Sequence, residues 1–584
     1  MKRTKIVATI GPASESEDVM RKLFEYGVNV CRLNFSHGDH EEHKARIDTI
    51  KKLRHEMNLP IAIMLDTKGP EIRLGTFKKD QIEIKKDQEF TLTTREVEGD
   101  ENIVSVSYKD MPKDVSVGDI ILIDDGLIEF RVVEITDTDI VMKALNSGIL
   151  KDHKGVNIPN VNINLPALTE RDIDDILFGI RNEVDYIAAS FVRKASDISS
   201  IRKVLEENGG ENIDIIAKIE NQQGLDNIDE ILVAADGIMV ARGDLGVEVA
   251  TEEIPLIQKT LIRKCNIAGK PVITATQMLD SMIRNPRPTR AEVTDVANAI
   301  IDGSSAVMLS GETAAGQYPI EAVKTMYNIA VTTENALDYD SISKLRAKDS
   351  AITTTNAISR ATVTTAQDLG AKAIITATSS GYTSKAISKF RPKAPIIAVT
   401  TNESVLRKLS LVWGVIPMLS RKSDSTDEVI ELSVKTALDA GLVKEGDLVV
   451  ITAGIPVGVA GTTNMIKVHT IGKVLLQGTG VGTKVGTGRV IIGNTKEELE
   501  EKFADGDVIV CKKTFDAIES FMKRASAIVC EEDGLSSHAA VMGLNLGIAT
   551  IVGVKNATKL LNDNEIITVE SATGQIYKGH AKIL

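Results

Sequence analysis

Cysteine is scarce in this chain of 584 residues, with only Cys31, Cys265, Cys511 and Cys530. No two of them form a C-x-x-C pair, which excludes the usual zinc-binding and dithiol redox motifs. Scattered cysteines of this kind are typical of thiols that stay reduced. We therefore expect a cytoplasmic protein without disulfide bonds.

Other absences narrow the function further. No run of about eighteen apolar residues occurs, so no membrane span is expected. The basic N-terminus is followed by an apolar run that stops at Gly11-Pro12, too early for a signal peptide. The net charge of −13 argues against nucleic acid as a partner. No G-x-x-x-x-G-K-[ST] motif is present, so any nucleotide is held without a P-loop.

Eight apolar runs recur at a spacing that fits alternating strands and helices. They are Thr4–Ile10, Val28–Phe35, Pro60–Thr67, Asp185–Phe191, Ile213–Glu220, Gly237–Gly243, Lys270–Gln277 and Ala306–Glu312. Helical patterns lie between them, such as Ser14–Tyr26, where Ser14 and Glu17 are expected to form a capping box. Strands that alternate with helices must be parallel, and eight of them favour an α/β fold, the (β/α)8 TIM barrel.

Polar side chains end seven of these eight runs. They are Arg32, Asn34 and Ser36, then Asp66 and Thr67, Ser190, Lys218 and Glu220, Arg242 and Asp244, Thr276, and finally Ser310 and Glu312. Lys218 and Glu220 are two apart in a strand and therefore share a face. A cation beside carboxylates can hold a divalent metal and neutralise a phosphoryl group, although a structural ion pair is the alternative. Because a barrel gathers its strand ends on one rim, we favour an active site.

The segment from Glu71 to about Pro166 interrupts this pattern with strands alone. Its expected strands are Gln81–Ile84, Glu89–Thr93, Ile120–Ile123, Ile128–Ile135 and Ile140–Lys143. They describe a small β-barrel or sandwich inserted at the catalytic end of the barrel, where it can act as a lid that excludes water. Lys154 is a candidate to close over phosphates, with a solvated loop lysine as the alternative.

Beyond the barrel the chain continues into two further α/β regions. We expect the barrel over 1–70 and 167–345, the lid over 71–166, an α/β domain over 346–473, to which the family resemblance described below gives an allosteric role, and an extra domain over 474–584. In the third domain a strand, Ala373–Ala377, precedes a small-hydroxyl loop and a helix at Lys385–Phe390. That arrangement suits an anion, as does the glycine-rich loop from Gly454 to Asn464, but either is equally compatible with a simple turn.

Several motifs together resemble the pyruvate kinase family. They are RLNFSHG (32–38), LDTKGPEIR (65–73), IDIIAKIENQQGL (213–225), ARGDLG (241–246), ATQML (275–279), NPRPTRAE (285–292) and SGETAAG (310–316). The resemblance covers residues 1 to about 472. It implies transfer of the phosphoryl group of phosphoenolpyruvate to ADP, giving pyruvate and ATP as the final step of glycolysis. It also implies a homotetramer and regulation by a phosphorylated metabolite.

The resemblance also implies roles for individual residues. Lys218, Arg32 and Thr276 are the expected catalytic residues, and Arg32, Gly243, Asp244 and Thr276 the expected substrate contacts. Asn34, Phe35, Ser36, His37, Arg73 and Lys154 are expected to bind nucleotide. Glu220 and Asp244 are the expected ligands of Mg²⁺ (or Mn²⁺), and Asn34, Ser36, Asp66 and the carbonyl of Thr67 those of K⁺. Thr378, Ser379, Ser380, Gly381, Tyr382 and Thr383 are expected to bind the effector, with a loop at Pro456–Gly461 covering it.

The resemblance bears on the cation requirement, the effector and the class of enzyme. Glu71 supports K⁺ dependence, because family members that do without K⁺ tend to carry lysine at this position. The identity of the effector stays open, since fructose 1,6-bisphosphate, a sugar monophosphate and AMP all suit one hydroxyl-lined pocket. A different metal-dependent barrel enzyme, such as a lyase acting on an oxoacid, fits less well with Lys218, both arginines and the lid.

The last domain resembles the mobile phosphohistidine domain of phosphoenolpyruvate-utilising enzymes. The sequence EDGLSSHAA (532–540) places His538 where that domain carries phosphate. Asp533 replaces a glycine of the motif, and Leu544 replaces an arginine whose fork would hold phosphate. The alternatives are therefore a phosphate carrier and a domain kept for stability or assembly. Its glycine-rich start, from Gly478 to Gly488, is expected to be a flexible entry.

Overall fold

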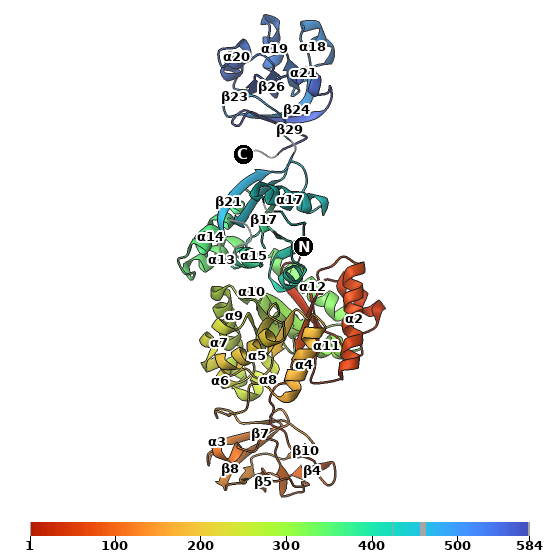
Figure 1. Ribbon diagram of the computed structural model, residues 1–584, viewed down its shortest axis with the longest axis vertical. Helices are drawn as coiled ribbons and strands as arrows, with labels where there is room; N and C mark the ends of the chain where they lie inside the picture. Colours follow the sequence, from red (N-terminus) through yellow and green to blue (C-terminus); the bar gives the residue numbers. More distant parts are fainter. Residues whose placement is uncertain (1, 424, 456–462, 473, 582–584) are drawn as a thin grey trace. The chain divides into compact units, whose positions relative to one another are not determined.

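Eight parallel strands close into a barrel in the computed structural model (Figure 1). They are β1 (Lys5–Thr9), β2 (Val30–Asn34), β3 (Ala62–Asp66), β12 (Tyr186–Ala189), β13 (Asp214–Ile219), β14 (Gly237–Ala241), β15 (Val272–Ala275) and β16 (Ala306–Leu309). Each lies within one of the eight apolar runs, so the predicted barrel is confirmed. The strands are shorter than predicted because the polar residues at their ends belong to the loops and helices that follow.

The structure describes residues 2–423, 425–455, 463–472 and 474–581. They divide into two units, each described here by itself. The first comprises Met1–Ser350, Ser388–Arg391 and Asn402–Pro417, and the second Ala351–Ile387, Pro392–Thr401 and Met418–Leu584. Among the described residues, no helix combines the length and the apolar character needed to span a membrane.

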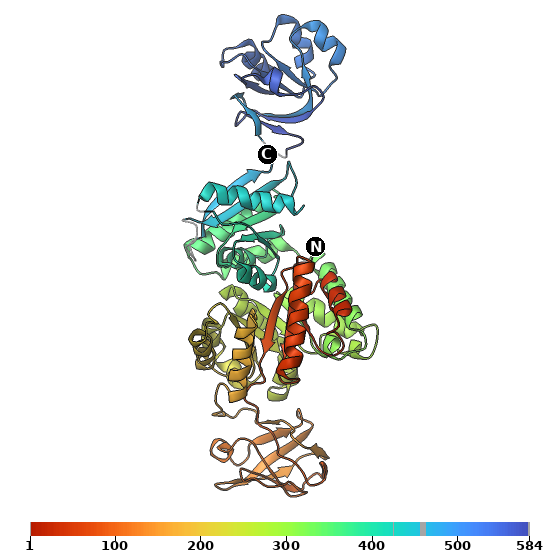
Figure 2. The same cartoon turned by 45° about the vertical axis from the view of Figure 1, so that its right-hand side comes forward.

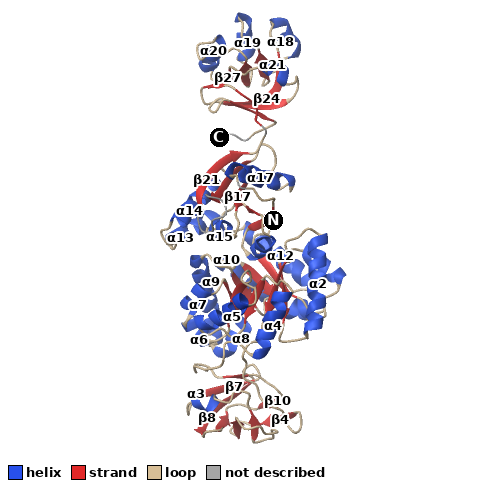
Figure 3. Ribbon diagram, viewed as in Figure 1, coloured by secondary structure: helices blue, strands red, loops and turns tan. Residues whose placement is uncertain are grey.

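Helices surround the barrel (Figures 2 and 3). They are α1 (Glu17–Glu25), α2 (His40–Glu56), α4 (Glu170–Arg181), α5 (Ala195–Glu207), α6 (Gln222–Asp226), α7 (Ile228–Ala234), α8 (Arg242–Glu248), α9 (Ile254–Ala268), α10 (Arg290–Asp302), α11 (Gly311–Ala314) and α12 (Pro319–Asn335). Helix α13 (Tyr339–Lys348) follows α12. Alternation within each strand supplies two cores. In β1, for example, Val7 belongs to one buried cluster while Ile6 and Ala8 belong to the larger cluster that includes the helices.

The starts of the helices show one wrong prediction. Helix α10 begins with a capping box between Thr289 and Glu292. The box predicted between Ser14 and Glu17 is absent, because α1 starts only at Glu17. The Ser14 hydroxyl instead accepts a hydrogen bond from the Gly11 amide at 3.2 Å, inside a tight turn.

The inserted segment is an all-β unit with its own core, as predicted. Six strands pair in the order β11-β7-β8-β9-β5-β6, and β10 pairs with β4. Their bounds are β4 (Gln81–Ile84), β5 (Glu89–Thr93), β6 (Ile103–Ser105), β7 (Ile120–Ile123), β8 (Ile128–Ile135), β9 (Asp139–Ala144), β10 (Gly148–Lys151) and β11 (Val156–Asn157). One short helix, α3 (Met111–Asp114), was not predicted. Phe90 and Phe130 stack at 5.8 Å within the core.

The next region is an α/β sheet with the strand order β19-β18-β17-β20-β21. Its elements are α14 (Thr354–Asp368), β17 (Ala373–Ala377), α15 (Tyr382–Ser388), β18 (Ile396–Thr400), α16 (Glu403–Lys408), β19 (Val415–Leu419), α17 (Thr426–Asp439), β20 (Leu448–Gly454) and β21 (Thr463–Thr470). Strand β17 coincides with its prediction. Helix α15 begins three residues earlier than predicted, so Tyr382 and Thr383 lie in its first turn.

The C-terminal region forms an eight-stranded sheet in the order β22-β29-β28-β24-β25-β26-β27-β23. Its elements are β22 (Val474–Gln477), β23 (Thr479–Val481), β24 (Val485–Ile492), α18 (Lys496–Lys502), β25 (Val508–Cys511), α19 (Glu519–Met522), β26 (Ala527–Cys530), α20 (His538–Leu546), β27 (Ala549–Val552), α21 (Ala557–Leu560), β28 (Ile566–Glu570) and β29 (Gln575–Lys578). The prediction that this region begins with a flexible segment is wrong, because residues from Gly478 to Gly488 contribute to β23 and β24. Gly480 permits this, since a Cβ there would lie 1.7 Å from the Ser571 carbonyl oxygen.

Candidate functional site

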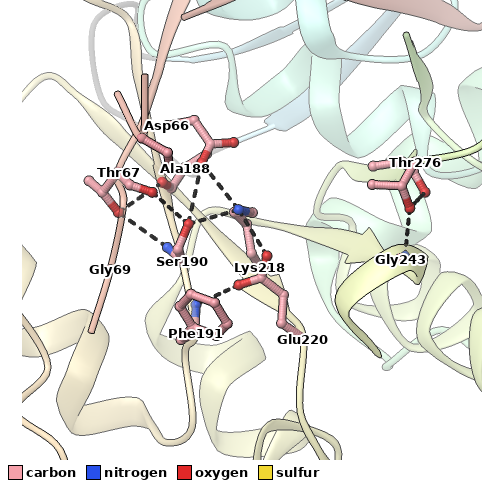
Figure 4. Close-up of polar contacts among 12 residues, drawn as sticks. Asp66, Thr67, Gly69, Ala188, Ser190, Phe191, Lys218, Glu220, Gly243 and Thr276 are labelled. Carbon is pink, nitrogen blue, oxygen red and sulfur yellow. Dashed lines mark hydrogen bonds and ion pairs between the residues drawn. The ribbon is translucent and has the colours of Figure 1, made fainter. Parts of the chain in front are cut away.

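Lys218 lies one residue before the end of β13, and its ammonium contacts three oxygen atoms (Figure 4). Its Nζ is 3.1 Å from Oδ1 of Asp66, 2.7 Å from Oγ of Ser190 and 2.8 Å from Oε1 of Glu220. An ammonium group has three N–H donors, and these three oxygens are their acceptors. Burial would lower the pKa of Lys218, but the charges of Asp66 and Glu220 outweigh it and raise that pKa. The side chain is therefore a fixed positive charge.

A second cation, Arg32, reaches the same carboxylate from β2. Its Nε donates to Oδ2 of Asp66 at 2.6 Å, and Nη1 donates to the Thr9 hydroxyl at 3.0 Å. Burial would raise the pKa of Asp66, which is fully buried, but Arg32 and Lys218 hold the pKa of this carboxyl below its usual value. One buried carboxylate thus orients two cations that face the same cavity.

Glu220 and Asp244 are the predicted ligands of a divalent metal, and their surroundings fit one. Glu220 is buried and its Oε2 accepts the Phe191 amide at 2.6 Å. Burial, together with the nearby charge of Asp244, raises the pKa of Glu220 to about 7, although Lys218 opposes the shift. Asp244 is exposed in α8 and lines the same cavity. Carboxylate oxygens that line one cavity suit Mg²⁺, which keeps waters and substrate oxygens among its ligands.

The described residues contain no cluster of three or more histidine, cysteine or acidic side chains placed to hold a metal ion by themselves. A metal bound at Glu220 and Asp244 therefore needs ligands from substrate or solvent. Sites of that kind are usual for Mg²⁺ in phosphoryl transfer.

The residues predicted to bind K⁺ lie on adjacent strands. Asn34 in β2 is paired in register with Asp66 in β3. The Thr67 carbonyl accepts the Ser190 hydroxyl at 2.6 Å, and Oδ1 of Asn34 accepts the Ser36 amide at 3.2 Å. These are hard oxygen groups, with Asn34 and Ser36 lining the cavity and Asp66 and Thr67 buried, a donor set that fits a monovalent cation without a soft ligand.

Glu71 and Arg73 line this cavity from the segment that leads into the lid. Nε of Arg73 donates to Oε2 of Glu71 at 2.7 Å, and Nη1 donates to the His153 carbonyl at 2.8 Å. Both side chains are partly exposed. Arg73 thus presents a guanidinium to the cavity, a group suited to phosphate oxygens.

Thr276 lies just beyond β15 and close to Gly243. Its Oγ1 accepts the Gly243 amide at 2.7 Å and donates to the Ala275 carbonyl at 2.6 Å. Its φ of 66° is in the left-handed region, which is unusual for a β-branched residue and common at functional sites. The Arg242 guanidinium donates to the Thr276 carbonyl at 2.7 Å and is paired with Asp295, which fixes this turn.

Eight predicted site residues line one cavity of about 410 Å³. They are Arg32, Asn34, Ser36, His37, Arg73, Lys218, Glu220 and Asp244. Lys68, Ser190 and Phe191 also line it and were not assigned a role from the sequence. Lys68 belongs to the LDTKGPEIR motif, and Ser190 was noted as the polar end of a run, so both carried a signal. Phe191 carried none, because its contribution is a backbone amide.

A neighbouring cavity of about 450 Å³ shares Glu71, Arg73, Phe191 and Asp244 with the first and is lined by Lys154. Nζ of Lys154 lies 2.7 Å from Oδ1 of Asp124. Lys154 therefore reaches a cavity adjoining the predicted metal ligands. Its role in nucleotide binding stays a prediction.

Phe35 is predicted to contact the nucleotide, but its aromatic ring does not line either cavity. It is buried and stacks on His43 at 3.9 Å, whereas its carbonyl accepts the Arg171 guanidinium at 2.9 Å. Its amide donates to the Asp66 carbonyl at 3.0 Å, so both backbone groups of Phe35 already have protein partners. His37, two residues later, is exposed at the cavity.

The predicted effector loop lies in the second unit. The Gly381 amide donates to the Thr378 hydroxyl at 3.0 Å, and the hydroxyls of Thr383 and Thr463 are 2.8 Å apart. Ser379 and Ser380 complete the turn before Tyr382, whose side chain is exposed. The covering loop at Pro456–Gly461 falls outside the described residues.

His538 is the first residue of α20, and its side chain is exposed. Its Nδ1 lies 2.9 Å from the Thr514 hydroxyl. Leu544, on the same helix, is 65% exposed. The predicted phosphate-bearing position thus has an oriented imidazole, and Leu544 farther along the same helix is apolar.

Three families match successive parts of the chain. Residues 1–323 match "Pyruvate kinase, barrel domain" and residues 356–469 match "Pyruvate kinase, alpha/beta domain". Residues 503–574 match "PEP-utilising enzyme, mobile domain". The order is the one expected from the motifs.

Curated relatives match from end to end. A pyruvate kinase of Geobacillus stearothermophilus is 55% identical over 585 residues, and one of Bacillus licheniformis is 54% identical over 586, each covering 100% of both chains. A crystal structure of a pyruvate kinase from Cryptosporidium parvum superposes with a TM-score of 0.77 at 40% identity. It covers 80% of this chain and 96% of that one. The additional C-terminal region is thus shared with the two bacterial relatives.

Proposed function

The chain belongs to the pyruvate kinase family and is a pyruvate kinase, and from this premise we propose how its residues carry out and regulate the reaction. The substrates implied are phosphoenolpyruvate and ADP. The observation that carries the proposal is the Lys218 ammonium, held by three oxygens at the edge of a cavity that also presents Arg32, Arg73, Glu220 and Asp244.

Phosphoryl transfer depends on positioning and on charge rather than on a covalent protein intermediate. Lys218 neutralises the phosphoryl oxygens during transfer, while Arg32 and Arg73 hold phosphate oxygens through their planar guanidinium groups. Gly243 and Asp244 are the proposed contacts of the substrate carboxylate. Thr276, with its hydroxyl beside the Gly243 amide, directs the proton that converts the enolate of pyruvate to the ketone.

Two kinds of cation complete the site. Glu220 and Asp244 would hold Mg²⁺ or Mn²⁺, which supplies positive charge to the phosphoryl and carboxylate oxygens of the substrate. Asn34, Ser36, Asp66 and the Thr67 carbonyl would hold K⁺. Asn34, Ser36 and His37 border the nucleotide together with Arg73 and Lys154.

The remaining proposals concern regulation and assembly. The hydroxyl-rich turn from Thr378 to Thr383 binds a small phosphorylated effector, supported by its three consecutive hydroxyl-bearing residues before the start of α15. The enzyme acts in the cytoplasm as a homotetramer. Four unpaired, buried cysteines agree with a reducing compartment.

The proposal is tested by coupling purified full-length protein to lactate dehydrogenase with phosphoenolpyruvate, ADP and Mg²⁺, with K⁺ or tetramethylammonium at equal ionic strength. NADH consumption that needs ADP and K⁺ is the expected result. Turnover undiminished without Na⁺ and K⁺ would contradict the K⁺ assignment. Addition of fructose 1,6-bisphosphate, a sugar monophosphate or AMP, with light scattering for the oligomer, tests the regulatory part.

A further inference from the structure

The hydroxyl of Ser190 lies between two functional groups that no sequence motif connects. Ser190 directly follows β12 and is 6% exposed. Its Oγ donates to the Thr67 carbonyl at 2.6 Å and accepts from Nζ of Lys218 at 2.7 Å (Figure 4). It therefore touches an expected K⁺ ligand on one side and the expected phosphoryl-neutralising cation on the other.

The direction of these hydrogen bonds follows from the number of protons. A serine hydroxyl has one proton to donate, and an ammonium has no lone pair with which to accept a hydrogen bond. Lys218 must therefore donate to Ser190, whose own proton goes to the Thr67 carbonyl. The alternative acceptor, Oδ1 of Asp66, is farther away at 3.3 Å. The chain of donors runs in one direction, from the ammonium through the hydroxyl to the carbonyl.

Ser190 is also the neutral member of the three acceptors around Lys218. The two carboxylates attract the ammonium from many directions, because charge attraction depends weakly on angle. A hydrogen bond to a neutral hydroxyl is directional and fixes where Nζ points. Ser190 thus fixes the direction in which the ammonium points, whereas the carboxylates of Asp66 and Glu220 keep Lys218 protonated.

The backbone holds this hydroxyl in place. The Ser190 amide donates to the Thr67 hydroxyl at 3.2 Å, and the following Phe191 has a φ of 55° with its amide bound to Glu220. Packing is close on the other side, since a Cβ on Gly69 would lie 2.8 Å from the Ser190 Cβ. Little room is left for Ser190 to move.

We propose that Ser190 is a positioning residue that couples the monovalent-cation site at Asp66 and Thr67 to the orientation of Lys218. This inference rests on the proposed roles of Lys218 and of the K⁺ ligands. A cation bound by the Thr67 carbonyl and the Asp66 carboxylate shares both groups with the network around Ser190. Removing the hydroxyl therefore weakens the site for the cation and loosens the lysine together.

The test compares Ser190→Ala with wild type in the full-length enzyme across K⁺ concentrations at constant ionic strength. Loss of one charge-assisted hydrogen bond is expected to lower kcat about tenfold to a hundredfold. The half-activating K⁺ concentration is expected to rise about tenfold, as for other residues that orient metal ligands. The KM for ADP is expected to stay within about twofold, because uniform binding is not removed.

A readout without turnover accompanies the kinetics. Trp413 is the single tryptophan of the chain, is buried and belongs to the same unit as the barrel. Its fluorescence follows thermal unfolding of that unit, and stabilisation by K⁺ is expected to need a higher K⁺ concentration in Ser190→Ala. Ser304→Ala is the matched control. It removes another buried barrel hydroxyl, 2.7 Å from that of Thr274, and should leave K⁺ activation unchanged.

The outcomes separate this inference from the function on which it rests. A wild type whose activity ignores K⁺ would contradict the proposed K⁺ site itself. A K⁺-dependent wild type with unchanged half-activation in Ser190→Ala would overturn the coupling, even if the variant were less stable or slower. Ser190→Thr, which keeps a hydroxyl, is a second variant. It is expected to restore part of the K⁺ response, and failure to do so in a folded protein counts against the proposal.

Discussion

Nζ of Lys218 lies 2.8 Å from Oε1 of Glu220, so the expected phosphoryl-neutralising cation and an expected metal ligand form one buried ion pair. Removing the cation from this pair is expected to cost activity through charge alone. Lys218→Met should lower kcat by about 10²–10³-fold, the scale for a lost electrostatic contact in a transition state. The coupled assay measures it. Lys203→Met, at an exposed lysine on α5, is the control and should keep full activity.

Lys218→Met also removes one of the two cations beside the buried carboxylates of Asp66 and Glu220. Breaking a buried pair in this way destabilises by about 3–5 kcal/mol. Trp413 fluorescence during thermal unfolding separates this loss from the kinetic effect. A folded Lys218→Met enzyme that keeps more than about a tenth of the wild-type kcat would contradict the electrostatic role.

Glu220→Gln tests the divalent site directly. The amide keeps the size of the side chain but removes the charge that Mn²⁺ or Mg²⁺ requires, so the affinity for Mn²⁺ should fall about tenfold or more. Electron paramagnetic resonance of free Mn²⁺ measures binding without turnover. Glu207→Gln, at an exposed glutamate, should bind Mn²⁺ as wild type does. Equal affinity in both variants would place the metal elsewhere.

Glu71→Lys tests the assignment of K⁺. An ammonium at this position on the cavity can supply the charge that K⁺ otherwise provides, so the variant is expected to turn over in buffer free of K⁺ and Na⁺. Glu71→Gln removes the carboxylate without adding a cation and should still require K⁺. If both variants need K⁺ as wild type does, the charge-replacement argument fails at this residue.

The barrel could be predicted because eight apolar runs and their polar ends follow from backbone periodicity. That Lys218 and Glu220 face the same cavity could be predicted for the same reason, since residues two apart in a strand share a face. The predicted strands end too late, because periodicity continues into residues such as Arg242 that begin a helix. The false capping box at Ser14 shows that a four-residue pattern cannot reveal a turn made by Gly11.

Other features had no local signal. The position of Ser190 between Thr67 and Lys218 depends on strands more than a hundred residues apart. The left-handed backbone at Thr276 is held by Arg242 from a neighbouring strand end. Such contacts form only when the barrel closes. The residues of the rim can therefore be predicted from the sequence, but their contact partners cannot.

Incubation with radiolabelled phosphoenolpyruvate tests His538. The imidazole is oriented by Thr514, but Leu544 offers no charge to hold a phosphate. We expect no acid-labile phosphate on the protein and unchanged kcat in His538→Ala, since the barrel residues carry the chemistry. Label present in wild type and lost in His538→Asn would instead establish a phosphate carrier.

The stability of the barrel unit should depend on pH through His43. Its ring is buried against Phe35, and Nε2 lies 2.9 Å from the His37 carbonyl. Burial lowers the pKa of His43 to about 4, despite the favourable contact with that carbonyl. The unfolded chain binds this proton near pH 6.5, and the folded chain binds it only near pH 4. Stability is therefore lost as the pH falls from about 6.5 to about 4, by roughly 3 kcal/mol in total.

Substituting His43 by a residue that does not titrate should remove this part of the acid sensitivity. In His43→Gln the melting temperature followed by Trp413 fluorescence is expected to fall less steeply between pH 6.5 and 4.5 than in wild type, whatever its value at pH 7. His55→Gln is the matched control, because His55 lies on the same helix α2 but is exposed. It should keep the wild-type slope. Parallel slopes in all three proteins would mean that His43 is protonated in the folded state, against its burial beside Phe35.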